Sequence, residues 1–316
     1  MSRTSPAGST VSTCLSDLFS GVPDPSPRPL LGCPLWAEPE WRGALYSSTA
    51  DADERLYQYG QVFDAVEGNT TFYALPTLDT VRRWASLLPV GSRFCAKLPR
   101  EVSHGDRLDL HHPELQRFFR HMAPLEQRLG PIWLQLPARF GPQHLEQLPA
   151  FLDALPGDYR YAVEVRHPHF FLKDDRERRL NRLLHERGIE RVMFDSRGLF
   201  ASRDTDPATL DAQSRKPRLP VHAVALAEHP TVRFIAGLDN SQSLHWLEPW
   251  VAKCAQWLGE GRSPMVFMHT PDNRLAPQLA RLFHARLAER LPDLPPMPDW
   301  PGELEQAHAP EQVGLF

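Results

Sequence analysis

The segment FDAVEGNTTFYALP, residues 63–76, is an apolar run that ends in a carboxylate instead of a turn. The apolar side chains of Phe63, Ala65 and Val66 predict a buried strand. Glu67 and Asn69 follow where this strand ends. A charged group in this place is costly unless it has a partner or a task. The role of Glu67 therefore depends on where the end of this strand lies in the fold.

The same kind of short apolar run recurs along the chain. The eight predicted strands are residues 30–36, 62–68, 92–99, 131–137, 161–168, 191–198, 232–238 and 264–271. Most begin roughly thirty residues after the previous one, which is about the length of a strand and a helix. Helical spacing and capping residues appear in the intervals 77–89, 113–130, 174–188 and 274–292.

Strands that alternate with helices predict an α/β fold with parallel strands, and eight of them favour a single (β/α)8 TIM-type barrel. An open doubly wound sheet is the alternative, but no G-x-G-x-x-G motif follows the first predicted strand. We expect the barrel to span residues 30–291. A flexible leader is expected at 1–29 and a proline-rich tail at 292–316. The charged segment 199–230 is expected to form a lid or a surface insertion.

Composition narrows the class of protein. The 316 residues carry a formal net charge of -4, which argues against a general nucleic-acid coat. No window approaches the length of apolar sequence that a membrane span needs, and residues 1–29 lack the apolar core of a secretory signal. The four cysteines, at 14, 33, 95 and 254, form no C-x-x-C pair. These features predict a cytoplasmic protein without a membrane partner.

Polar side chains lie near the end of nearly every predicted strand. In a TIM-type barrel, chemistry occurs at the carboxyl ends of the strands, so these side chains are expected to meet in one mouth. The candidate catalytic residues are Glu67, Lys97, Glu164 and Asp195. The candidate ligand-binding residues are Asn69, Thr71, Tyr73, Gln135, Arg166, His167, Arg197, Arg233, His269 and Asn273.

Spacing along the strands supports this grouping. Glu164 and Arg166 are two residues apart, so on a strand they point the same way, as do Asp195 and Arg197. Glu67 is expected to face Lys97 on the neighbouring strand, where the opposite charge offsets the cost of burial. The alternative is that such pairs are structural ion pairs inside the barrel.

The cations predicted at the mouth favour an anionic ligand, because guanidinium groups suit phosphate and carboxylate oxygens. We therefore expect an enzyme that performs acid–base chemistry on an anionic small molecule or a nucleic-acid fragment, with Glu67 or Glu164 as general base. A non-catalytic anion-binding or metabolite-binding barrel is one alternative.

A metal-dependent, endonuclease-like DNA-binding protein is another alternative, with ligands from Glu67, Glu164, Asp195 and His269. The neighbouring lysine and arginines would compete with a cation, and few histidines lie nearby. No cofactor is predicted, and a divalent metal is the less favoured hypothesis.

Several motifs together resemble the YecE-like family, also called domain of unknown function 72. The resemblance rests on VEGNTTFYALPTLDTVRRWASLLPVGSRFCAKLPREVSH (66–104), GPIWLQLPARF (130–140), AVEVRHPHFF (162–171) and FMHTPDNRLAPQLARLFH (267–284), and on a Gly-Cys-x-x-Trp pattern in LLGCPLWAEPEW (30–41). It covers roughly residues 30–290. The resemblance implies a TIM-type barrel similar in shape to those of xylose isomerase and endonuclease IV, and it implies no settled activity. Many members have an Asn-rich segment where this chain has HTPDN (269–273).

Overall fold

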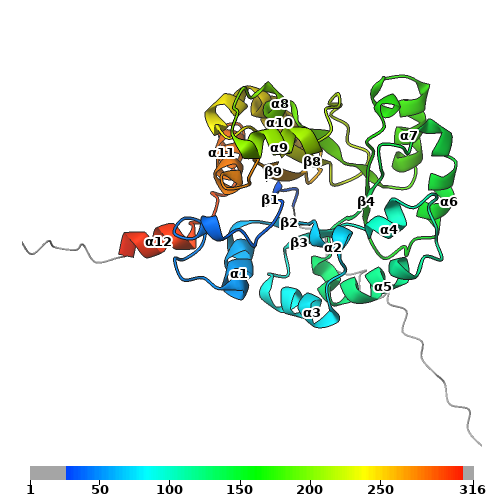
Figure 1. Ribbon diagram of the computed structural model, residues 1–316. Coiled ribbons are helices and arrows are strands. Elements are labelled where there is room, and N and C mark those ends of the chain that lie inside the picture. Colours follow the sequence, from blue (N-terminus) through cyan, green and yellow to red (C-terminus); the bar gives the residue numbers. More distant parts are fainter. Residues whose placement is uncertain (1–25, 309–316) are drawn as a thin grey trace, which may run out of the picture.

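The computed structural model describes residues 26–308, in which strands and helices alternate (Figure 1). The strands are β1 (Leu30–Cys33), β2 (Ala65–Gly68), β3 (Arg93–Ala96), β4 (Ile132–Gln135), β5 (Tyr161–Glu164), β6 (Glu190–Arg191), β7 (Met193–Asp195), β8 (Thr231–Ile235) and β9 (Met265–His269). They form one sheet in the order β3-β2-β1-β9-β8-β7 and another in the order β4-β5-β6. Every strand pair in these sheets is parallel, which confirms the predicted α/β class.

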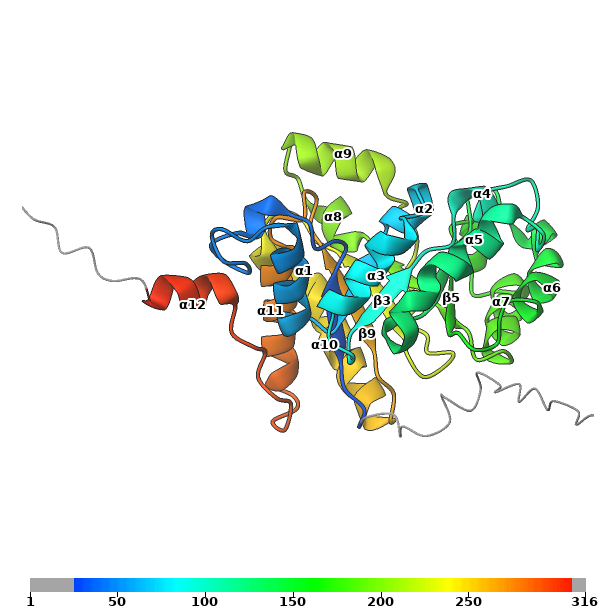
Figure 2. The same ribbon diagram turned by 90° about the horizontal axis from the view of Figure 1, so that it is seen from below.

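Helices connect successive strands and cover their outer side (Figures 1 and 2). Their bounds are α1 (Ala52–Val62), α2 (Thr70–Tyr73), α3 (Leu78–Leu87), α4 (Arg100–Ser103), α5 (Pro113–Met122), α6 (Gln147–Asp153), α7 (Asp175–His185), α8 (Arg197–Ala201), α9 (Pro207–Arg215), α10 (Asn240–Gly259), α11 (Ala276–Ala288) and α12 (Pro301–His308). Local sequence sets where several of them begin. Asp51 and Glu54 form a capping box at α1, and the hydroxyl of Thr77 accepts a hydrogen bond from Thr80 N at α3.

Two connections bring the sheets together. Leu98 N donates to Trp133 O at 2.9 Å, and an isolated parallel bridge joins Lys97 to Trp133, so the end of β3 contacts β4. On the other side, a single residue, Val192, separates β6 from β7. Its N–H donates to Val163 O on β5 at 2.9 Å. One short stretch of chain therefore pairs first with β5 and then with β8.

Alternation along the strands separates two of the buried clusters of the core, one on each face of the strands. The side chains that pack against the helices include Leu31, Val66, Phe94, Leu134 and Val163. The opposite strand faces carry a second buried cluster, composed of Leu30, Ala65, Cys95, Trp133, Ala162, Val192, Met265 and Phe267. Because side chains alternate, the residue two positions after a member of the second cluster lies on the same face. Glu67 follows Ala65, and Lys97 follows Cys95, in this way.

The segment 199–230 contains most of α8 and all of α9, and its last part leads to β8. In Figure 2, α9 lies beyond the strand ends, on the side where α2, α4 and α8 also lie. This is the side to which the carboxyl ends of the strands point. The segment therefore lies near the end of the fold that carries the predicted site.

The chain remains packed beyond residue 291. Trp300 is 1% exposed, Gln306 donates to Gly43 O, and Glu305 accepts hydrogen bonds from the main chain and side chain of Ser48. At the other end, Arg28 forms an ion pair with Asp64. The expectations for residues 1–25 and 309–316 lie outside the described residues. Within residues 26–308, no helix combines the length and apolar character that crossing a membrane requires.

Candidate active site

Glu67 is the centre of a buried polar cluster at the carboxyl end of the strands. Its Oε1 lies 2.7 Å from Nη2 of Arg233 and 3.2 Å from Nζ of Lys97. Its Oε2 accepts from Nε of Arg233 at 3.0 Å and lies 2.9 Å from Nε2 of His269. A carboxylate only accepts, so Nε2 of His269 carries the proton of this hydrogen bond. These side chains come from β2, β8, β9 and the end of β3.

Arg233 links this carboxylate to a second one. Its Nη1 donates to Oε2 of Glu164 at 2.9 Å. The other oxygen of Glu164 accepts from Nε of Arg166 at 2.8 Å and lies 2.7 Å from its Nη2. Glu164 is fully buried, whereas a quarter of the Arg166 side chain is exposed. The cluster thus extends from a buried centre to a solvent-accessible guanidinium.

The floor of the cluster is amide and aromatic. Nζ of Lys97 donates to Oε1 of Gln135 at 3.2 Å and lies 5.1 Å from the ring centre of Trp133. The guanidinium of Arg233 lies 5.0 Å from the ring centre of Phe194. Aromatic faces attract cations, so these rings stabilise the two buried positive charges.

Charge neighbours determine the protonation of the two carboxylates. Burial alone would raise their pKa values, but the nearby cations outweigh it. Arg233 and Lys97 hold the pKa of Glu67 well below its usual range. Arg166 and Arg233 lower the pKa of Glu164 to about 2. Both groups are therefore ionised at neutral pH.

Lys97 and His269 have lowered pKa values, whereas Glu67 and Glu164 raise the pKa of Arg233. Burial, together with Arg233, lowers the pKa of Lys97 to about 8, against the opposing effect of Glu67. Burial also lowers the pKa of His269 to about 4, although Glu67 favours its protonated form. His269 is therefore neutral at pH 7.

The structure adds Lys216, which the sequence analysis did not single out. Lys216 follows α9, and the carbonyl of the next residue, Pro217, accepts from Oγ of Ser196 at 2.8 Å. Burial lowers the pKa of Lys216 to about 8, and charges on Arg233, Glu67, Glu164 and Arg166 also act on it. Its ammonium has no carboxylate within ion-pair distance among residues 26–308. The sequence signal was weak, because SRKPRLP shows no strand or helix periodicity.

The cluster carries more positive than negative charge. Its anions are Glu67 and Glu164, and its cations at pH 7 are Lys97, Arg166, Arg233 and Lys216. The sequence left open whether the arginines merely neutralise the acids. In the described structure Arg166 and Arg233 balance the two acids, and Lys97 and Lys216 supply the surplus positive charge.

Asp195 requires a correction. The sequence predicts that it lies with Glu67, Lys97 and Glu164, but the structure places it on the opposite face of its strand. Phe194 faces Arg233, and alternation turns the next side chain toward the helices. There Asp195 accepts from Nε1 of Trp250 at 2.7 Å and pairs with Arg197, also at 2.7 Å. The two side chains contact each other, although Arg197 begins α8 and does not continue the strand as predicted.

Three predicted ligand-binding residues make hydrogen bonds that involve main-chain atoms. Oγ1 of Thr71 lies 2.9 Å from Lys97 N and 2.8 Å from Lys97 O, which fixes α2 beside β3. Nδ2 of Asn69 donates to Pro34 O at 3.0 Å. Asn273 has a φ of 62°, and its carbonyl accepts from Nε1 of Trp41 at 3.0 Å. These contacts position the loops around the cluster.

Two further candidates lie at the periphery. Tyr73 is 73% exposed, and its ring packs edge-on against Phe72. Nδ1 of His167 accepts from His169 N at 3.2 Å, at the start of the short 3-10 helix Pro168–Phe171. Neither side chain contacts Glu67 or Glu164.

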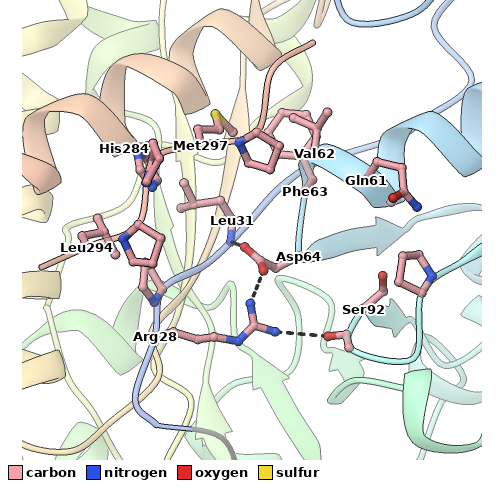
Figure 3. Close-up of a pocket in the computed structure, with 17 residues that line it drawn as sticks. Arg28, Leu31, Gln61, Val62, Phe63, Asp64, Ser92, His284, Leu294 and Met297 are labelled. Atoms are coloured by element: carbon pink, nitrogen blue, oxygen red, sulfur yellow. Dashed lines mark hydrogen bonds and ion pairs between the residues drawn. The ribbon is translucent and has the colours of Figure 1, made fainter. Parts of the chain in front are cut away.

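Residues 26–308 contain no group of three or more His, Cys, Asp or Glu side chains placed to hold a metal ion. A cavity of about 280 Å³ lies at the other end of the strands, lined by residues at or before the starts of β1, β2 and β3, by His284 on α11 and by residues 294–298 (Figure 3). Arg28 and Asp64 pair in its wall. This cavity is remote from the polar cluster.

Comparison with known proteins identifies the family. The sequence profile described as "Protein of unknown function DUF72" matches residues 30–302. The chain belongs to the DUF72 family. It is 42% identical over 271 residues to UPF0759 protein YecE of Escherichia coli K12, covering 86% of this chain and 97% of that protein. The predicted YecE-like resemblance is confirmed.

Solved DUF72 structures share the fold. A DUF72 family protein from Thermotoga maritima MSB8 has a TM-score of 0.60 and 19% identity, covering 84% of this chain and all of the other. One from Enterococcus faecalis V583 has the same TM-score and 17% identity, covering 84% and 98%. At these identities the likeness concerns the fold alone.

The neutral His269 of this DUF72 protein predicts acid-sensitive stability. Its pKa is about 4 in the fold and near 6.5 when unfolded, so the unfolded chain binds more protons between these values. The free energy of unfolding should therefore fall as the pH drops from 6.5 to 4, by up to about 3 kcal/mol from this residue.

Urea unfolding at pH 7.0, 5.5 and 4.5 measures the effect. His269→Gln keeps an N–H for Glu67 but cannot titrate, so it should lose less stability over this range than the wild type. His111→Gln, at an exposed position, should follow the wild type. Parallel curves for His269→Gln and the wild type would contradict the prediction.

Proposed function

We propose that this DUF72 protein is an enzyme that binds an anionic small molecule at the polar cluster and performs acid–base chemistry on it. The observation that carries the proposal is the surplus of positive charge, above all the Lys216 ammonium without a carboxylate partner within residues 26–308. A phosphate or carboxylate group would supply the missing negative charge. A nucleic-acid fragment offers the same anion, but the net charge of -4 favours a small molecule.

The contacts support different roles for the two acids and for Lys216. Both oxygens of Glu67 and of Glu164 already accept charged hydrogen bonds, and low pKa values make these carboxylates weak bases. They hold Arg233, Arg166 and Lys97 in position. Lys97 and Lys216 both have a pKa of about 8, but only Lys216 has no carboxylate at ion-pair distance within residues 26–308, so it is the group suited to exchange a proton near neutral pH. It therefore takes the role of general base.

We also infer that the two sheets close into one TIM-type barrel. The bridge from Lys97 to Trp133 and the continuous chain from β6 to β7 support this closure. Closure would bring the polar strand ends into a single mouth. We further propose a cytoplasmic location, which agrees with the free, buried thiols of Cys33, Cys95 and Cys254.

Binding of inorganic phosphate tests the proposal. Isothermal titration should detect it in the wild type, and Lys216→Ala should weaken it at least about tenfold, because a charge-assisted hydrogen bond contributes about 1.5–3 kcal/mol. Lys253→Ala removes a lysine whose Nζ bonds to Gln256 on α10, and it should bind like the wild type. No binding by the wild type, or equal binding by Lys216→Ala, would refute the anion site.

Turnover is tested separately. The protein is incubated with panels of phosphorylated and carboxylated metabolites, and products are sought by mass spectrometry. Lys216→Met should abolish any conversion found, and the wild-type rate should rise with pH toward 8 as the amine loses its proton. Ligands that bind without conversion would indicate a non-catalytic binding protein.

A further inference from the structure

A hollow of about 470 Å³ lies between α8, α10 and the segment that follows α9. Its lining includes Ser196, Arg197, Phe200, Arg218, Leu219 and Trp246. Figure 2 shows α8 and α9 at the end of the fold to which the strands point. The volume lies in the usual range for small-molecule sites.

The walls of the hollow pair guanidinium groups with aromatic rings. The guanidinium of Arg197 lies 5.1 Å from the ring centre of Trp246, and Asp195 fixes its other side. The guanidinium of Arg218 lies 5.5 Å from the ring centre of Phe200. Within residues 26–308, Arg218 has no carboxylate at ion-pair distance. The hollow thus offers flat, positively charged and aromatic surfaces.

Two segments of the chain connect the hollow with the polar cluster. Lys216 belongs to the polar cluster, and Arg218, two residues later, lines the hollow. An extended chain advances about 7 Å over two residues, so one ligand can reach both side chains. On the strand side, Phe194 contacts Arg233, and Ser196 lines the hollow while it holds Pro217 O.

We propose that the hollow binds the flat ring of the ligand whose anionic group occupies the mouth, so that the substrate class is an aromatic or heteroaromatic anion such as a nucleotide. Planar rings stack on tryptophan and on guanidinium planes. Removing the protein ring on which a base stacks measurably weakens binding of that base. This inference rests on the proposed function, since the mouth supplies the charge that the ligand must match.

Titrations with adenosine 5′-monophosphate, ribose 5-phosphate and inorganic phosphate test the inference. The first should bind at least about tenfold more tightly than the second, because only it carries a ring. Arg218→Ala and Trp246→Leu should each weaken binding of the nucleotide about tenfold and change binding of ribose 5-phosphate less than about threefold. Trp246→Phe keeps a ring and should retain most of the affinity.

Arg203→Ala is the matched control, because Arg203 is an exposed arginine of the same segment that does not line the hollow. Circular dichroism establishes that each variant is folded. Equal affinities for the nucleotide and ribose 5-phosphate, or wild-type nucleotide affinity in both Arg218→Ala and Trp246→Leu, would overturn the ring site.

The results distinguish failure of the ring-binding hollow from failure of the proposed anion site at the polar cluster. If the ring site fails while Lys216→Ala still loses phosphate, the proposed anion site stands. If Lys216→Ala binds phosphate normally while Arg218→Ala loses the nucleotide, the ring site stands and the mouth assignment is wrong. If no nucleotide binds to the wild type, the ring site is refuted.

Discussion

Arg233→Met is expected to destabilise the protein by about 3–5 kcal/mol, as removal of one partner from a buried charge network does. Arg233 donates to both oxygens of Glu67 and to one oxygen of Glu164. Methionine fills a similar volume but leaves both buried carboxylates with fewer cations. Lys97 and His269 still contact Glu67, and Arg166 still contacts Glu164, which limits the loss.

Urea unfolding followed by circular dichroism at pH 7 measures this loss. Arg233→Lys keeps the charge but cannot span both carboxylates, so its stability should lie between that of Arg233→Met and that of the wild type. Arg215→Met removes an exposed arginine that pairs with Asp211, and it should change the free energy of unfolding by less than about 0.5 kcal/mol. A loss below about 1 kcal/mol for Arg233→Met would show that the two acids do not depend on this guanidinium.

The positions of the strands were predictable, because each buried strand is a short apolar run in the sequence. Such runs identify a strand but leave its last residues uncertain, so the predicted segment 191–198 became β6, Val192, β7 and the start of α8. The difference between the predicted and the observed strand matters at Asp195, the last residue of β7. A period of two orients every residue of a strand once one residue is oriented, and nothing in VMFDSRG showed that Phe194 faces Arg233.

The cluster around Glu67 was predictable for a related reason. Four polar residues each lie two positions after an apolar residue of the inner strand face, so the alternation of side chains places them on that same face. They are Glu67, Lys97, Gln135 and Glu164. Lys216 had no such signal. It reaches the cluster from a loop, and its position depends on long-range contacts such as the hydrogen bond from Ser196 to Pro217 O.

Gly32→Ala is expected to destabilise the protein by about 3 kcal/mol or more, the upper end for a side chain forced into a packed core. Gly32 is the β1 residue paired with Ala65 on β2 and with Phe267 on β9. A Cβ at this position would overlap the carbonyl oxygen of Ala65 and lie 2.7 Å from its carbonyl carbon. Both atoms belong to the backbone, so no side-chain rotation relieves the overlap, and β1 and β2 would have to separate.

Gly157→Ala is the matched control, because a Cβ there meets no atom within 4 Å and the residue does not have a positive φ. Its free energy of unfolding should stay within about 0.5 kcal/mol of the wild type or rise slightly.

The separation of β1 and β2 in Gly32→Ala has a second consequence, because Glu67 lies two residues beyond Ala65. Moving β2 would draw its carboxylate away from Arg233 and His269, so Gly32→Ala should also weaken phosphate binding in whatever fraction of the protein remains folded. Unchanged stability together with unchanged phosphate affinity would mean that the two strands tolerate a wider spacing than the close contact at Gly32 implies.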